Sequence, residues 1–313
     1  MSFTNLGRRV LLFALLLVVI DANAFELRVQ QVTDDVYALV GDTGPRTYDN
    51  HALNNTLGFV VTAEGVVLVD SGATPEGARL IEKAIAGVTH LPVRWVINTG
   101  MQDHKWMGNS YFAVKGAEII ALRRTVDGQK ELAESHVQRL NSVLKERAAA
   151  VEPVYADRIV DADRAAIELG GVQFELIWLG DSHFPGDGVV WLPEQRLVFT
   201  GDLVYVDRML GIQQVTSVKA WQGSFNALKA LNPLHVVPGH GDACDLAKAQ
   251  RETGDYLDWL VVEVGKAIEE WKELGETVDS LADAPRFKHL ENFSSWHRIN
   301  INRTYLQLEA EAL

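Results

Sequence analysis

The second half of the chain reads Ser182-His183-Phe184-Pro185-Gly186-Asp187, then Phe199-Thr200-Gly201-Asp202, then Val237-Pro238-Gly239-His240-Gly241, and these three stretches decide its fold. Each one carries a polar, glycine-marked turn at or after the end of a β-rich run. The edge of a sheet exposes such turns to a common cleft. Imidazole and carboxylate groups at the ends of rigid strands are suitable ligands for zinc or iron. The stretches therefore predict that side chains far apart in the sequence meet in one cleft.

The rest of the chain predicts two strand-rich halves, each with helices. Strands are expected at residues 27–32, 36–40, 58–61, 66–69, 93–97, 119–122, 173–178, 188–192, 197–200 and 235–237. Helices are expected after Pro75, as an amphipathic surface insert at about 124–150, near 220–231, over 246–274 and over 294–308. Such a pattern predicts two sheets packed face to face between helical layers.

The first residues indicate a targeting segment that precedes a single domain. Arg8 and Arg9 come before an apolar run from Val10 to Ile20, and Ala22-Asn23-Ala24 has the small-x-small pattern of a cleavage site. The run is about half the roughly 20 residues that a membrane-spanning helix needs. We therefore expect a cleaved signal over 1–24, a mature domain over 25–313 with C-terminal helices at about 246–313, and a periplasmic or secreted protein without a stable membrane anchor. The twin arginines leave the general secretory and twin-arginine routes both open.

Composition excludes several classes of protein. The 313 residues are 47% hydrophobic, enough for a large core, and the formal net charge of −13 disfavours binding to nucleic acid. The only cysteine, Cys244, has no partner within the chain, so stability must come from packing or metal, and we expect an inert thiol. A small-molecule substrate is the expected partner, and the sequence does not indicate an oligomeric state.

The quoted motifs resemble those of the metallo-β-lactamase superfamily, and the resemblance covers essentially the whole mature chain. It implies an α/β fold, the αββα four-layer sandwich of two packed sheets flanked by helices. It also implies roles for individual residues. His183 is similar to the histidine of the first metal site, Asp202 to the bridging carboxylate, and His240 to the histidine of the second site. Asp70, in the turn Asp70-Ser71-Gly72, is similar to the acid that steadies the ligand loops from behind.

The chain departs from this family in one loop. Members carry His-x-His-x-Asp-His after a strand ending in Asn-Thr, whereas this chain reads Asn98-Thr99-Gly100-Met101-Gln102-Asp103-His104-Lys105-Trp106-Met107-Gly108-Asn109. An ungapped register places Gly100 and Gln102 at the two histidine positions, His104 at the aspartate and Lys105 at the last histidine. A gapped register keeps Asp103-His104 as the familiar pair but needs a deletion and an insertion. We favour the ungapped register, and a loop of this kind is similar to an exported branch that includes proteins encoded beside sulfur-oxidation genes.

This departure favours one well-held metal ion over two. His104 is a ligand candidate in both registers, Asp103 only in the gapped one, and the neutral amide of Gln102 binds such metals weakly. His104, Asp202 and His240, with His183 as a further candidate, supply enough donors for one zinc ion, and iron is the alternative. Lys105 is a candidate contact for a substrate anion or else a solvated side chain. His51, in an asparagine-rich loop, is a candidate to line the cleft.

The resemblance and the ligand set together predict a periplasmic metal-dependent hydrolase of an ester, thioester, amide or similar small molecule. Asp202 and an adjacent group such as His104 would handle the proton, and the metal would stabilise the developing oxyanion. Two alternatives stay open, namely iron-dependent redox or sulfur chemistry and a non-catalytic binding protein with a decayed site. The fold alone does not choose among them.

Overall fold

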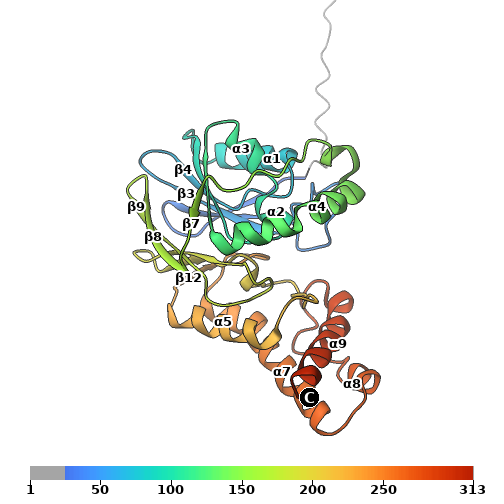
Figure 1. The fold of residues 1–313 in the computed structure, drawn as a ribbon. Helices are drawn as coiled ribbons and strands as arrows, with labels where there is room; N and C mark the ends of the chain where they lie inside the picture. The colour runs from blue at the N-terminus through green and yellow to red at the C-terminus, as the bar shows by residue number, and fades with distance from the viewer. Residues whose placement is uncertain (1–24, 313) are drawn as a thin grey trace, which may run out of the picture.

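The computed structural model of the protein describes residues 25–312, so the expected signal segment over 1–24 lies outside the described residues. Two β-sheets face each other, and helices cover the outer face of each (Figure 1). This is the expected αββα sandwich. None of the described helices combines the length and the apolar character needed to cross a bilayer.

The first sheet has seven strands in sequence order. They are β1 (Arg28–Gln31), β2 (Val36–Val40), β3 (Thr56–Val61), β4 (Val66–Val69), β5 (Val93–Asn98), β6 (Glu118–Leu122) and β7 (Arg158–Val160). Strands β1 to β4 pair antiparallel and β4 to β7 pair parallel. Helices α1 (Pro75–Ala86) and α3 (Asn109–Ala113) pack on its outer face, at the top of Figure 1.

The second sheet has five strands in the order β12-β11-β10-β9-β8. Their bounds are β8 (Arg164–Leu169), β9 (Val172–Ile177), β10 (Val189–Leu192), β11 (Leu197–Phe199) and β12 (His235–Val237). Only β11 and β12 pair parallel. Helix α5 (Val218–Ala230) covers its outer face, and α7 (Asp255–Glu269) packs on α5. Helix α9 (Phe293–Ala312) packs on α7, with α8 (Leu274–Ser280) beside it (Figure 1).

The main core lies between the sheets, and alternation within single strands builds it. In β4, Val67 and Val69 face the other sheet while Val66 and Leu68 face the helices. Gly58 of β3 lets the sheets approach closely, because a Cβ there would lie 2.2 Å from the ring of Phe199 in β11. The close approach fixes how the strand ends of the two sheets face each other.

Two helical segments bear on the site. The predicted insert is α4 (Arg123–Leu144) followed by the 3₁₀ turn η1 (Lys145–Ala148), and α4 contacts the short helix α2 (Asp103–Trp106). The single helix predicted over 246–274 is wrong in detail. It consists of α6 (Leu246–Ala249), a π turn η3 (Gln250–Gly254) and α7, which ends at Glu269.

The π turn has a local cause. It places the Thr253 hydroxyl against the backbone of Tyr205, where it accepts from the Tyr205 nitrogen at 2.9 Å and donates to the Tyr205 oxygen at 2.5 Å. These two bonds tie the helix to the segment that follows β11. The hydrophobic period of the sequence does not report such a bond, which is why the turn was not predicted.

Candidate metal centre

Strand ends bring the candidate side chains to one edge of the sandwich. Asp202 lies in the 3₁₀ turn η2 (Gly201–Leu203) directly after β11, and His240 follows β12. These two strands are parallel neighbours, so their carboxyl ends lie side by side. His104 lies in α2, which follows β5 of the other sheet. The two sheets therefore contribute to the same cluster.

Three of these residues form a compact donor group. His104, Asp202 and His240 are buried, and each offers a ligand atom within 4.8 Å of the other two. The His104 Nε2 atom lies 3.1 Å from Asp202 Oδ2, and the His240 Nε2 atom lies 3.5 Å from Asp202 Oδ1. Zinc ligands lie about 2.0–2.2 Å from the ion, so donors at this separation fit a single ion.

The surroundings of His240 prepare it as a ligand. Its Nδ1 atom donates to the carbonyl oxygen of Asn54 at 2.7 Å, which leaves the lone pair of Nε2 directed toward Asp202. The Tyr205 ring stacks on the imidazole with centroids 4.5 Å apart. Burial, together with the charge of Arg208, holds the pKa of His240 well below its usual value. The ring is therefore neutral, as metal binding requires.

His104 is held from two sides. The Arg46 guanidinium lies 3.0 Å from its Nδ1 atom, and because arginine only donates, Nδ1 accepts and Nε2 donates to Asp202. A cation on Nε2 requires the ring proton to be on Nδ1 instead. Asp103 Oδ1 lies 3.4 Å from Nδ1 and is the acceptor for that arrangement. His104 thus fits a metal site once Arg46 withdraws from Nδ1.

Asp103 faces away from Asp202, as the ungapped register predicts. Its Oδ2 atom accepts from Arg46 at 2.7 Å and from Arg139 of α4 at 2.8 Å, and its Oδ1 atom accepts from the His104 backbone nitrogen. Burial raises the pKa of Asp103, but Arg46, His104 and Arg139 outweigh burial and hold it well below the usual value. The gapped register, with Asp103 as a metal ligand, does not agree with this placement, because both oxygens are already bound elsewhere.

A cavity of about 390 Å³ opens beside the donor group. His104 and His240 line it, as does Gln102, which directly precedes α2. Tyr205 and Trp296 form part of an apolar wall. This volume lies within the roughly 300–1,000 Å³ of small-molecule sites.

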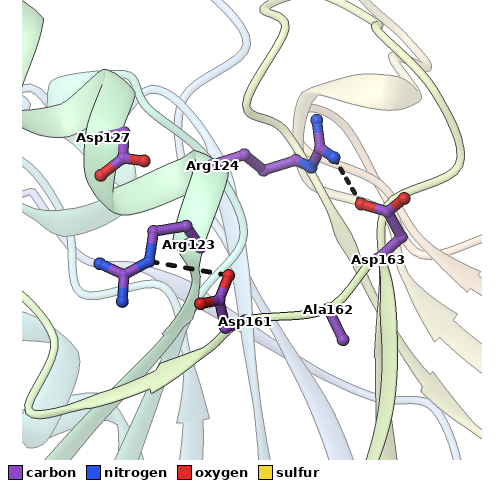
Figure 2. A pocket seen from close by; sticks show the side chains of 6 residues that line it. All are labelled: Arg123, Arg124, Asp127, Asp161, Ala162 and Asp163. Carbon is purple, nitrogen blue, oxygen red and sulfur yellow. Dashed lines mark hydrogen bonds and ion pairs between the residues drawn. The ribbon is translucent and has the colours of Figure 1, made fainter.

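A second hollow of about 340 Å³ shares no residue with the donor group. Figure 2 shows its lining, which is Arg123, Arg124, Asp127, Asp161, Ala162 and Asp163. Its two arginines each pair with an aspartate, Arg123 with Asp161 and Arg124 with Asp163. Both arginines of this hollow are therefore paired within the described chain.

The comparisons with known proteins agree with this geometry. Residues 103–240 match the sequence model of the "Metallo-beta-lactamase superfamily". A relative named "Metallo-beta-lactamase type 2" from Bacteroides fragilis is 24% identical over 236 residues, which cover 69% of this chain and 80% of that protein. The solved metallo-beta-lactamase from Pontibacter korlensis is 24% identical at a TM-score of 0.59, covering 74% of this chain and 99% of its own.

A stereoselective inverting sec-alkylsulfatase from Pseudomonas sp. matches with a TM-score of 0.68 at 15% identity, covering 90% of this chain and half of its own. The two solved structures show the shared fold, and the matched residues run from the start of α2 to His240. The chain therefore has the metallo-β-lactamase fold, and residues 103–240 match the model of that superfamily.

Under the ungapped register, Gly100 stands at the first histidine position of the loop after β5. A Cβ on Gly100 would lie 2.8 Å from Asp187 Oδ1, so the Asp187 carboxyl occupies the space that the first histidine of the superfamily loop would need. Asp187 accepts from the backbone nitrogens of Phe184 and Met101. Burial raises its pKa to about 8. The sequence places Asp187 at the end of the motif that begins at Ser182 but does not indicate a role for it.

Lys105, which the ungapped register places at the last loop histidine, is fully buried. Its Nζ atom lies 2.9 Å from Asp202 Oδ1 and 3.5 Å from Asp70 Oδ2. Burial lowers the pKa of Lys105, but Asp202 and Asp70 outweigh burial and raise it. The lysine is therefore charged and internal. The expectation of a substrate contact or a solvated side chain is wrong for Lys105, because it does not line the cavity.

Asp70 lies behind the site. It has a φ of 66°, and its carboxylate accepts from the backbone nitrogen and the hydroxyl of Thr99. Burial raises the pKa of Asp70, and Lys105 opposes this. Asp70 thus joins the end of β4 to the end of β5 and supports Lys105, which in turn contacts Asp202.

His183 lies beside the donor group but is not part of it. Phe184, Tyr205 and Trp221 surround its ring with centroids 5.0–5.7 Å away, and burial lowers its pKa to about 4. Its Nδ1 atom is buried without a hydrogen bond among the described residues. Positions 100 and 102 carry no histidine, and His183 joins no group of three candidate ligands among the described residues.

Two further residues, His51 and Cys244, lie away from the donor group. His51 contacts Arg147 at 3.2 Å and Glu76 at 3.5 Å, and it is not among the residues that line the cavity. Cys244 packs against the core below the second sheet. Burial raises the pKa of its thiol to about 12, in keeping with an inert cysteine.

Proposed function

We propose that this chain is a metal-dependent hydrolase that holds one divalent cation at His104, Asp202 and His240. The observation that carries the proposal is the donor group itself, two imidazoles and one carboxylate with separations that suit one ion. The Lys105 ammonium, 2.9 Å from Asp202 Oδ1, supports a single ion, because a second cation beside the same oxygen would be repelled. Zinc is the proposed metal.

The residues of the site have distinct tasks in this proposal. When bound, a metal ion supplies Lewis acidity and lowers the pKa of water. Burial raises the pKa of Asp202, but Lys105 and His104 hold it well below its usual value, so Asp202 stays ionised. An ionised Asp202 can both bind the cation and accept a proton from an attacking water. Asp70 and Lys105 fix the carboxylate from behind.

The proposed substrates are esters, thioesters, amides or related small molecules that fit the cavity of about 390 Å³. Names of the relatives support hydrolysis, since the matched proteins include β-lactamases and an alkylsulfatase. We also propose that the chain acts outside the cytoplasm, on the basis of Arg8, Arg9 and the run that follows them.

Metal content and hydrolysis measured on the same preparations test the proposal. Protein purified without added metal should contain one zinc ion per chain by elemental mass spectrometry. A panel of chromogenic esters and thioesters should be hydrolysed, with activity lost on chelation and restored by zinc. His240→Ala should lose the ion, whereas His90→Ala, at an exposed histidine away from the cavity, should keep it. Protein that binds no divalent metal, or that hydrolyses the panel equally well without it, would refute the proposal.

A further inference from the structure

The wall of the cavity is positively charged although the chain is acidic. Three arginines line it, Arg46, Arg139 and Arg208, and no aspartate or glutamate stands among its lining residues in the described part of the chain. The formal net charge of the whole chain is −13. Three guanidinium groups at one cavity are therefore a local exception that the composition does not explain.

Two of these arginines share a single acid. Arg46 and Arg139 both donate to Asp103 Oδ2, at 2.7 and 2.8 Å, and Asp103 lies outside the cavity lining. One carboxylate therefore balances two guanidinium groups. Arg46 and Arg139 together therefore leave one positive charge at the cavity wall without a negative partner.

Arg208 makes no ion pair with an acidic residue in the described part of the chain. Its Nη1 atom donates to the carbonyl oxygens of Gly44 at 3.0 Å and Asn54 at 3.1 Å, which fix the group in place. No carboxylate of residues 25–312 lies within 4.0 Å of it, and its buried Nε atom has no hydrogen bond there. Guanidinium groups that leave water are normally paired, because the loss of solvation is costly. A held, unpaired arginine at a cavity indicates a charged ligand.

We propose that the cavity binds its substrate through an oxyanion, a carboxylate, sulfate or phosphate group, that pairs with Arg208 and faces Arg46 and Arg139. Arginine suits such groups because its planar fork matches their oxygens. The apolar wall of Tyr205 and Trp296 takes the uncharged part of the molecule. This inference rests on the proposed function, since it names the class of substrate at the same site, a small organic anion.

The binding of two probes of matched shape tests the effect of the ligand's charge alone. Phenylacetate and 2-phenylacetamide have nearly the same shape and differ in charge, and calorimetry can measure both. Chelator-treated, metal-free protein is the sample, because a carboxylate could otherwise bind to the ion. We expect phenylacetate to bind about tenfold more tightly than the amide or better, and its affinity to fall as salt is raised.

Variants test whether the preference for phenylacetate comes from the arginines that line the cavity. Arg208→Gln should weaken phenylacetate binding by about tenfold or more and leave the amide unchanged. Arg251→Gln removes the same charge from an exposed position away from the cavity, so it should change neither affinity. Arg139→Gln, whose side chain is 45% exposed, should cost about two- to fivefold. A circular dichroism melt shows whether Arg208→Gln folds. If it does not fold, Arg139→Gln still tests the proposal.

The outcomes separate this inference from the proposed function. Equal affinity for the two probes, no phenylacetate binding up to about 50 mM, or a preference that survives in folded Arg208→Gln would overturn the inference. A chain that prefers phenylacetate yet binds no metal would refute the hydrolase and keep the anion site. A zinc-loaded hydrolase without the preference would do the reverse.

Discussion

Lys105 places a fixed positive charge inside the site, between Asp202 and Asp70. Removing one partner of a buried ion pair costs about 3–5 kcal/mol, because the remaining charge stays buried without compensation. We expect Lys105→Met to lower the free energy of unfolding of the metal-free protein by about that amount in a urea titration. Lys229→Met, at an exposed lysine of α5, should change it by less than about 0.5 kcal/mol. A Lys105→Met variant as stable as wild type would show that the ammonium does not balance these carboxylates.

Asp103 and His104 are neighbours with different roles in this geometry. Asp103→Asn should keep one zinc per chain at saturating zinc and weaken affinity by roughly 10–100-fold, the usual effect of a residue that supports a ligand. His104→Ala should fail to saturate, because a donor atom is lost. Competition with a chromogenic chelator measures both affinities. Loss of the ion in Asp103→Asn alone would restore the gapped register of residues 100–105.

The sequence does not predict the site residues that lie outside any motif or regular spacing. His183, Asp202 and His240 lie in motifs at strand ends, so their neighbourhood could be predicted. Arg46 and Arg208 are single arginines in loops, and only the folded chain brings them to the cavity. Neither spacing nor local composition indicated either arginine.

At the scale of elements, the π turn η3 supports the site through Thr253. Thr253→Val preserves shape but removes both bonds to the Tyr205 backbone, leaving a buried nitrogen unsatisfied at about 1–3 kcal/mol. Because Tyr205 stacks on His240, we also expect weaker zinc binding. Thr277→Val is the matched control, since the Thr277 hydroxyl is buried without a hydrogen bond in the described structure. Thermal melts and zinc titrations of the pair should differ, and equal results would contradict a supporting role for η3.

The elements themselves were predictable where the pattern was strong. Strands β2, β4 and β12 have the predicted bounds, because apolar runs between turns define them. The pattern does not predict strands β7 and β8, because no side chain of β7 and only two of β8 are buried. Helix α2 was also missed, since four residues show no period. It carries His104, so the decisive loop was the hardest to predict.

At the scale of the whole molecule, the segment before Phe25 predicts export. The mature chain should begin near Phe25, with a formal net charge of −14 once Arg8, Arg9 and Asp21 are removed. Intact mass measurement on protein from a periplasmic extract of the producing cell checks this. A soluble periplasmic protein that retains Met1 would contradict cleavage.

The central claim is that His104, Asp202 and His240 hold a single metal ion. The buried ammonium of Lys105 lies beside Asp202 in this site. Zinc K-edge X-ray absorption on the zinc-saturated protein tests it most directly, because the spectrum reports the ligands and any neighbouring metal. We expect nitrogen and oxygen ligands at about 2.0–2.2 Å with the outer-shell signal of two imidazoles. A zinc–zinc distance of about 3.5–4 Å, the mark of a two-metal site, or a shell without histidine would contradict the account.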